Sequence, residues 1–359
     1  MAKGLAGKSG RTLAELEPFE VNTGQLSREQ WAAFHTFRRL RHQEDNPDHP
    51  LLPDEVFEQD MKREDPFRDR RYFWVWDGKR VVADFGCGAV KPGAPGYESN
   101  RHLLWCGAGV IKSYRRRHLG RKLLGVALAQ MDAFGATTLT AGTDQPDGHA
   151  FLKAMGFAPR FTGRESRLDF QQVDWGLVRR WIEEGERRSP QTRLELYDPR
   201  IPDQLLEDFC IAITRMLNTM PLQDLDHGEL VVTPAMAGDR YARWAEQGRV
   251  EYTALTREPD GSVTGITDVS WAPYDAGFIF QGFTGVWPEA RGRGLGKWLK
   301  AAMLEHVHRK HPETRWVVTD NATTNAPMLA INTALGFREH RRGTSYQITR
   351  EELEKSLRG

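Results

Sequence analysis

The chain has 359 residues, of which 39% are hydrophobic and 28% charged, which is typical of a soluble globular protein with about two domains. Its net charge of +1 gives no global field that would recruit nucleic acid or an acidic membrane, and no run approaches the ~18 apolar residues of a membrane span. The three cysteines form no C-x-x-C pair, and residues 1–11 have no apolar signal-peptide core. We therefore expect a cytoplasmic protein with reduced cysteines.

Alternating strand and helix patterns run through both halves of the chain. In the first half we expect a helix from Ser27 to Asp45 and strands at 72–76 and 81–87, followed by a charged connecting helix at 173–188 and a linker at 189–191. In the second half we expect strands at 193–197, 252–256, 264–271, 278–286 and 316–319, with a helix at 202–218. These patterns predict an α/β (α+β) fold in which a mixed, mostly antiparallel sheet is flanked by helices.

The glycine-rich turn between the strand at 278–286 and the helix that follows is the most informative stretch. Its glycines leave the backbone amides accessible at a helix N-terminus, where unpaired N–H groups and the helix dipole favour an anion. Arginine and lysine side chains surround the same turn. We therefore predict a pyrophosphate cradle formed by Arg291, Gly292, Arg293, Gly294, Leu295, Gly296 and Lys297.

This turn occurs twice in the chain. The segment Gly109–Arg121 aligns without gaps with Gly285–Lys297, and the Gly-Phe pair at 156–157 repeats at 336–337. Two ordered blocks of similarity predict two tandem domains, which we place at residues 12–185 and 186–359.

The closing block of the second copy has its own pattern. Asn325 is placed to cap a helix with Pro327 in its first turn, and Gly336 is a natural stop. Asn321 stands at the end of the preceding strand.

The pattern R-x-x-G-x-G, met by Arg291, Gly294 and Gly296, resembles the acyl-CoA-binding motif of the GNAT superfamily of N-acetyltransferases. The closing block resembles that of actinobacterial-type GNAT enzymes. The resemblance implies acetyl-CoA as co-substrate, with its pantetheine arm between splayed strands near Val286 and in contact with Asn321 and Asn325. It also implies direct transfer of an acetyl group to a primary amine of a small molecule. From the sequence itself we expect no metal, nucleic acid or membrane partner, and a monomer or homodimer.

The catalytic residues that the family often uses are absent. The motif strand has no carboxylate, and Asn332 stands where a tyrosine acid is expected. Asp268, on the preceding strand, is the nearest candidate base, and Asn332 can donate a hydrogen bond to the departing thiolate. Alternatives are a base in the loop 224–227, ordered water, and Tyr346 as acid.

The two copies differ at the turn. His118 replaces the middle glycine of the first copy, which narrows the space beside a phosphate. We therefore expect a catalytic C-terminal domain beside a degenerate N-terminal one. A mycothiol-synthase-like or aminoacyl-transferring tandem GNAT enzyme and a non-catalytic acyl-CoA sensor remain alternatives.

Overall fold

The computed structural model describes residues 16–275 and 277–359, and the chain divides into two compact units. Unit 1 contains the chain up to Pro159 together with the C-terminal segment Ser345–Gly359, and unit 2 contains Arg160–Thr344. None of the helices in the described part of the chain is both long enough and apolar enough to cross a membrane.

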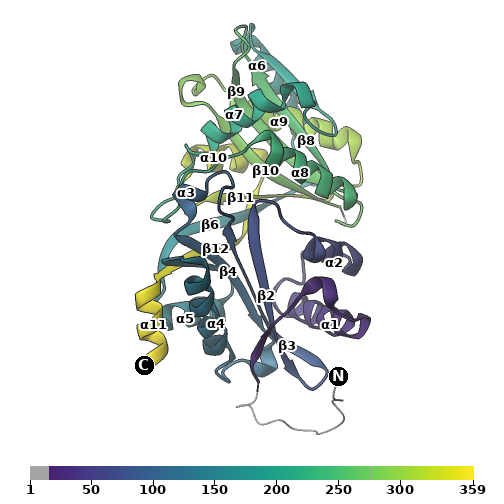
Figure 1. Ribbon diagram of the computed structural model, residues 1–359. Coiled ribbons are helices and arrows are strands. Elements are labelled where there is room, and N and C mark those ends of the chain that lie inside the picture. The colour runs from purple at the N-terminus through teal and green to yellow at the C-terminus, as the bar shows by residue number, and fades with distance from the viewer. Residues whose placement is uncertain (1–15, 276) are drawn as a thin grey trace. The chain divides into compact units, whose positions relative to one another are not determined.

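Unit 1 is a sheet with the strand order β1-β2-β3-β4-β5-β12, covered by helices on both faces (Figure 1). On one face Arg71 of β2 bonds Gln130 of α4, and on the other Phe34 of α1 stacks on Trp74 of β2 with 4.0 Å between the ring centroids. Its elements are β1 (Pro18–Glu20), α1 (Arg28–Asp45), α2 (Asp54–Lys62), β2 (Arg68–Asp77), β3 (Arg80–Val90), α3 (Tyr97–Asn100), β4 (Leu103–Val110), α4 (Leu119–Phe134), β5 (Thr138–Thr143), α5 (Pro146–Ala154) and α11 (Arg350–Arg358).

Unit 2 repeats this architecture with the strand order β6-β11-β10-β9-β8-β7. Tyr252 and Ala254 of β8 pack in the cluster beneath α6 and α9, whereas Leu255 packs in the cluster beneath α7 and α8. Because successive strand residues point to opposite faces, these two clusters are the two faces of one sheet. The elements are α6 (Trp175–Arg188), β7 (Arg193–Tyr197), α7 (Leu206–Leu217), α8 (Pro234–Glu246), β8 (Val250–Arg257), β9 (Val263–Trp271), β10 (Phe278–Val286), α9 (Leu295–Lys310), β11 (Trp316–Ala322) and α10 (Ala326–Leu335).

Each half of the sequence contributes its last strand to the other unit. β6 (Ala158–Asp169) is the last strand of the first half but pairs antiparallel with β11, from Trp316↔Asp169 to Ala322↔Gly163. β12 (Arg338–Thr349) follows the second half, and its end pairs with β5 and adds Tyr346 and Ile348 to the core of unit 1. The units are therefore not the predicted continuous segments 12–185 and 186–359, whose first residues, 12–15, lie outside the described part.

The predicted fold class is confirmed. Within the registers described for each unit, only β4–β5 and β10–β11 are parallel, and every other pair is antiparallel. The predicted strands at 193–197 and 278–286 have the observed bounds of β7 and β10. The helices α2 and α8 were not predicted.

In each unit the two parallel strands separate before the longer one ends. β10 pairs with β11 from Phe278↔Trp316 only as far as Gln281↔Thr319, yet it continues to Val286. β4 pairs with β5 only as far as Cys106↔Ala141 and continues to Val110. The last residues of β4 and β10 therefore have one edge without a ladder partner.

Candidate functional site

The open edge of β10 carries the predicted residue Val286. The N–H of the next residue, Trp287, donates to Thr264 O at 2.9 Å, on the side of β9. Because successive strand residues turn their N–H groups to opposite edges, the N–H of Val286 faces the edge that β11 has left. This N–H can pair with an extended molecule that takes the place of a strand.

The predicted cradle lies directly after this edge. Gly292 and Gly294 have φ values of +78° and +86°, in the left-handed region that favours glycine. Gly294 is the N-cap of α9, so the N–H groups of Leu295 and Gly296 lie in the first turn, where α-helical partners are absent. A Cβ on Gly296 would stand only 3.4 Å from the Ile331 side chain of α10. The turn therefore combines the predicted helix N-terminus with a close approach of α9 and α10 that was not predicted.

The cations of the cradle have different surroundings. Arg291 is exposed; its Nε donates to Val286 O at 3.1 Å and its Nη2 to Thr219 Oγ1 at 3.2 Å, so its two bonded partners are neutral. Lys297 is exposed, with its Nζ 5.0 Å from the Trp181 ring centroid. The Arg293 guanidinium, in contrast, donates to Glu258 Oε1 at 2.8 Å and also bonds Thr192. Glu258 thus compensates the charge of the Arg293 side chain. Only the backbone N–H of Arg293 is left to contribute to an anion site.

The three asparagines of the closing block have separate roles. Asn325 is the N-cap of α10, and its Oδ1 accepts from Met328 N at 3.3 Å. Asn321 lies on β11 beyond the last residue paired with β10. Asn332 is fully buried and donates from Nδ2 to Asn321 Oδ1 at 2.7 Å. Asn332 therefore holds Asn321 at the open edge, which differs from the expected contact with a leaving thiolate.

Asp268 lies beside the bulge of β10 and close to a second acid. Its Oδ2 accepts from Phe283 N at 3.2 Å, three residues before Val286. A Cβ on Gly282 would be 2.0 Å from Asp268 Oδ1, so the carboxyl group lies directly over that glycine. The β8–β9 register pairs Thr253 with Asp268 and Glu251 with Ser270, which puts Glu251 and Asp268 on one face.

An arginine from α8 interacts with both acids. Arg240 Nη2 donates to Glu251 Oε1 at 3.0 Å. Desolvation and the charge of Glu251 raise the pKa of Asp268 to about 7, against the opposing effects of Arg240 and the Phe283 N–H. Desolvation also raises the pKa of Glu251. A carboxyl group with a pKa near neutrality is suited to accept a proton.

Sequence reasoning identified Asp268 but missed Glu251 and Arg240. The signal for α8 was present, since Thr233 caps a helix whose first residue is Pro234. The suggested acid Tyr346 lies in the core of unit 1, where its hydroxyl bonds His149 Nδ1 at 3.0 Å.

The first copy has the same turn with different side chains. Arg116 and His118 have φ values of +61° and +64°, at the positions of Gly292 and Gly294. Arg115 Nε donates to Val110 O at 2.9 Å, as Arg291 Nε does to Val286 O. The backbone of the cradle is therefore retained, but side chains stand where the second copy has glycines.

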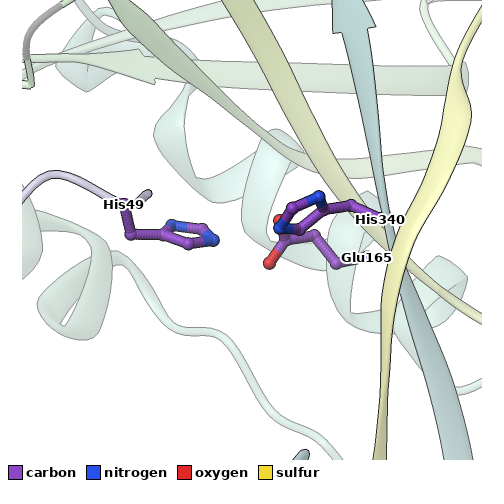
Figure 2. Close-up of side chains that lie close together, drawn as sticks. All are labelled: His49, Glu165 and His340. Atoms are coloured by element: carbon purple, nitrogen blue, oxygen red, sulfur yellow. The ribbon is translucent and has the colours of Figure 1, made fainter. Parts of the chain in front are cut away.

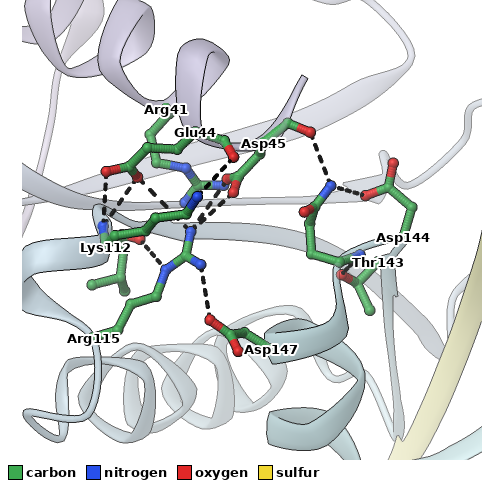
Figure 3. A network of polar contacts seen from close by, with 10 residues as sticks. Arg41, Glu44, Asp45, Lys112, Arg115, Thr143, Asp144 and Asp147 are labelled. Carbon is green, nitrogen blue, oxygen red and sulfur yellow. Dashed lines mark hydrogen bonds and ion pairs between the residues drawn. The ribbon is translucent and has the colours of Figure 1, made fainter. Parts of the chain in front are cut away.

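Acidic groups surround the arginine of the first cradle (Figure 3). Arg115 donates to Asp45 Oδ1 and to Asp147 Oδ2, each at 3.0 Å. Both oxygens of Glu44 accept from Lys112 N, at 3.1 and 3.0 Å. In the first copy, carboxylates thus pair with Arg115, whereas the equivalent Arg291 of the second copy bonds neutral groups. The carboxylates of the first copy would also repel a pyrophosphate.

Figure 2 draws His49, Glu165 and His340, three side chains whose atoms could serve as metal ligands. Glu165 and His340 belong to unit 2, on β6 and β12, and His49 belongs to unit 1. The Glu165 carboxylate accepts from Arg167 Nε at 2.9 Å and from Arg341 Nε at 2.8 Å. Two groups from one unit, one of them engaged by two arginines, do not make a metal site.

Comparison with known proteins gives a family match in the first unit and a fold match over most of the chain. The model of the Acetyltransferase (GNAT) family matches residues 31–157. A tandem GNAT protein from the clavulanic acid biosynthesis pathway is similar in structure, with a TM-score of 0.71 and 23% identity over 94% of this chain and 99% of that one. A GCN5-related N-acetyltransferase from Sphaerobacter thermophilus has a TM-score of 0.63 and 14% identity, over 93% and 96% of the two chains. No curated protein matches.

The family match falls on the copy whose turn has Arg116 and His118 at the positions of Gly292 and Gly294. A match to the family model therefore does not identify which of the two turns has the glycine backbone. The match to the tandem GNAT protein covers 94% of this chain and therefore includes both units. At 23% identity, this match shows similarity of fold alone. Residues 31–157 therefore match the GNAT family, and the chain as a whole has a fold similar to that of a tandem GNAT protein.

Proposed function

We propose that unit 2 is an acyl-CoA-dependent N-acyltransferase that transfers acetyl from acetyl-CoA to a primary amine of a small molecule. The observation that carries this proposal is the contrast between the two cradles. Arg291 bonds only neutral groups beside an open strand edge, whereas Arg115 is paired with two carboxylates.

The residues of unit 2 fit a CoA thioester along one continuous path. The N–H groups of Leu295 and Gly296, with the side chains of Arg291 and Lys297, would bind the pyrophosphate. The open N–H of Val286 would bind the extended arm or polarise the thioester carbonyl, as an oxyanion-hole donor does. Across from it, Asn321 of β11 and Asn325, the N-cap of α10, would offer amides to the same arm.

Asp268 would take the proton that an ammonium group must lose before its nitrogen can attack. The new N–C bond forms as the C–S bond breaks, and the thiolate leaves with the electron pair of that bond. Burial, together with the negative charge of Glu251, raises the pKa of Asp268 to about 7, so this carboxyl group is suited to accept a proton near neutral pH.

The proposal is tested by turnover with acetyl-CoA and a panel of primary amines. Asp268→Asn should lower turnover by about 10²–10⁴-fold while CoA affinity stays unchanged, and kcat/KM of the wild type should rise as pH increases through about 7. Glu251→Gln should shift that rise to lower pH, because a charge that raises the Asp268 pKa is gone.

Three results would contradict parts of the proposal. CoA binding without turnover of any amine would favour an acyl-CoA sensor. Full activity of Asp268→Asn at neutral pH would transfer the role of base to water or to the loop 224–227. A pH profile that Glu251→Gln leaves in place would remove Glu251 from the site.

A further inference from the structure

A hollow of about 270 Å³ lies on the sheet of unit 1. It is lined by β2, β3 and β4, and every lining residue belongs to unit 1. The volume is just below the range of about 300–1,000 Å³ that holds drug-sized ligands, so it suits a smaller molecule.

Glycines form the floor of this hollow. Gly86 is paired with Tyr72 on one side and with Gly107 on the other, and Gly88 is paired with Arg70 and Trp105. Paired residues share a face of the sheet. The space over two of these glycines is partly occupied, because a Cβ on Gly86 would stand 3.3 Å from the Tyr72 ring and one on Gly88 would stand 3.1 Å from Asp69 O. A Cβ on Gly107 would meet no atom within 4 Å.

The rim is cationic and aromatic. Arg68 is exposed, with its guanidinium carbon 5.6 Å from the Trp105 ring centroid, and no carboxylate pairs with its side chain among the described residues. Arg70 is fixed by Arg63 O at 2.9 Å and lies 3.6 Å from Asp60 Oδ2. No acidic residue lines the hollow. On the same face, two residues along β3 from Gly86, lies Asp84, whose charge is opposed by Arg41.

We propose that this hollow binds a small planar anion, a single aromatic or heteroaromatic ring that carries a carboxylate. The ring lies over Gly107, beside Trp105, where no Cβ stands in its way. The carboxylate pairs with Arg68, whose planar guanidinium offers two parallel N–H donors. This site is separate from the acyl-transfer site proposed for unit 2, and its test does not depend on turnover.

The test is a titration of the full-length chain with benzoate, followed by calorimetry and ligand-observed NMR to about 10 mM. Benzamide serves as the neutral analogue and cyclohexanecarboxylate as the non-planar one. We expect saturable binding of benzoate, weaker by at least about tenfold for both analogues. Arg68→Gln should weaken benzoate binding to the same degree, and Gly107→Leu should abolish it by filling the floor.

Two variants control for charge and for glycine replacement. Arg80→Gln removes an exposed arginine at the far end of β3, and Gly125→Leu fills open space on α4; neither should change benzoate binding. Melting temperatures check that Gly107→Leu is folded. Absence of saturable benzoate binding to the wild type, equal binding of benzamide, or binding that survives in folded Arg68→Gln and Gly107→Leu proteins would each overturn the proposal.

Discussion

The motif arginines Arg291 and Arg115 should have opposite roles, although each donates from Nε to the carbonyl five residues earlier. Arg291→Ala removes an exposed charge that bonds only neutral groups, so its effect should fall on CoA. A hydrogen bond to a charged group contributes about 1.5–3 kcal/mol. At about 1.4 kcal/mol per tenfold, CoA binding should weaken about 10–150-fold while the melting temperature changes little.

Arg115→Ala should instead destabilise unit 1 and leave CoA affinity unchanged. The variant leaves Asp147 without its 3.0 Å partner, whereas Asp45 keeps Arg41 at 2.8 Å. Because the Asp45 side chain is only 4% exposed, we expect a loss of about 1–3 kcal/mol in the free energy of unfolding. At about 2–4 °C per kcal/mol, this corresponds to a melting temperature about 2–12 °C lower.

Calorimetric titration of CoA at about 0.15 M ionic strength, with thermal melts of each variant, measures both effects. The reasoning is refuted if Arg115→Ala weakens CoA binding as much as Arg291→Ala does. It is equally refuted if Arg291→Ala leaves the Kd within about threefold of the wild type.

Two further predictions concern stability. Burial lowers the pKa of Lys300 from 10.5 to about 7. Between these two pH values the unfolded chain therefore binds more protons than the folded one. The free energy of unfolding should consequently fall as pH drops from 10.5 to about 7. Lys300→Leu, which introduces the residue type of the equivalent Leu124, should remove that pH dependence and raise stability at pH 7 by about 1–4 kcal/mol in chemical denaturation; an unchanged pH dependence would contradict this. Leu353 of α11 is fully buried in the core of unit 1, so Leu353→Ala should lower the free energy of unfolding by about 2–5 kcal/mol. Hydrogen-exchange protection should fall in β2–β5 of unit 1 and stay unchanged in β8–β11 of unit 2. Equal loss of protection in both sets of strands would contradict the assignment of the C-terminal segment to unit 1.

Local patterns were sufficient to predict the elements around the cradle. The apolar run of β10 and the helical spacing of α9, separated by a glycine-rich cap, specify their structure within a few residues of sequence. The repeat of this unit predicted two similar sheets. These inferences depend on neighbours in the chain.

Pairings between distant segments were not predictable in the same way. The sequence of β6 is compatible with either unit, and its partner β11 lies about 150 residues further along, so the boundary at 185 followed chain order. Asp45 and Asp147 are separated by roughly a hundred residues and meet only at Arg115. Likewise, the influence of Glu251 on Asp268 follows from the β8–β9 register and not from a motif.

The central claim is that a single cradle in this chain accepts CoA and that it is the one in unit 2. The most direct measurement is the calorimetric stoichiometry of CoA binding to the full-length wild type, repeated with Gly294→Val, which places a branched side chain at a left-handed position of that cradle. The account predicts one strong site per chain in the wild type, with affinity at least about tenfold weaker in the folded variant. Two sites of equal affinity, or one site that Gly294→Val leaves intact, would contradict it.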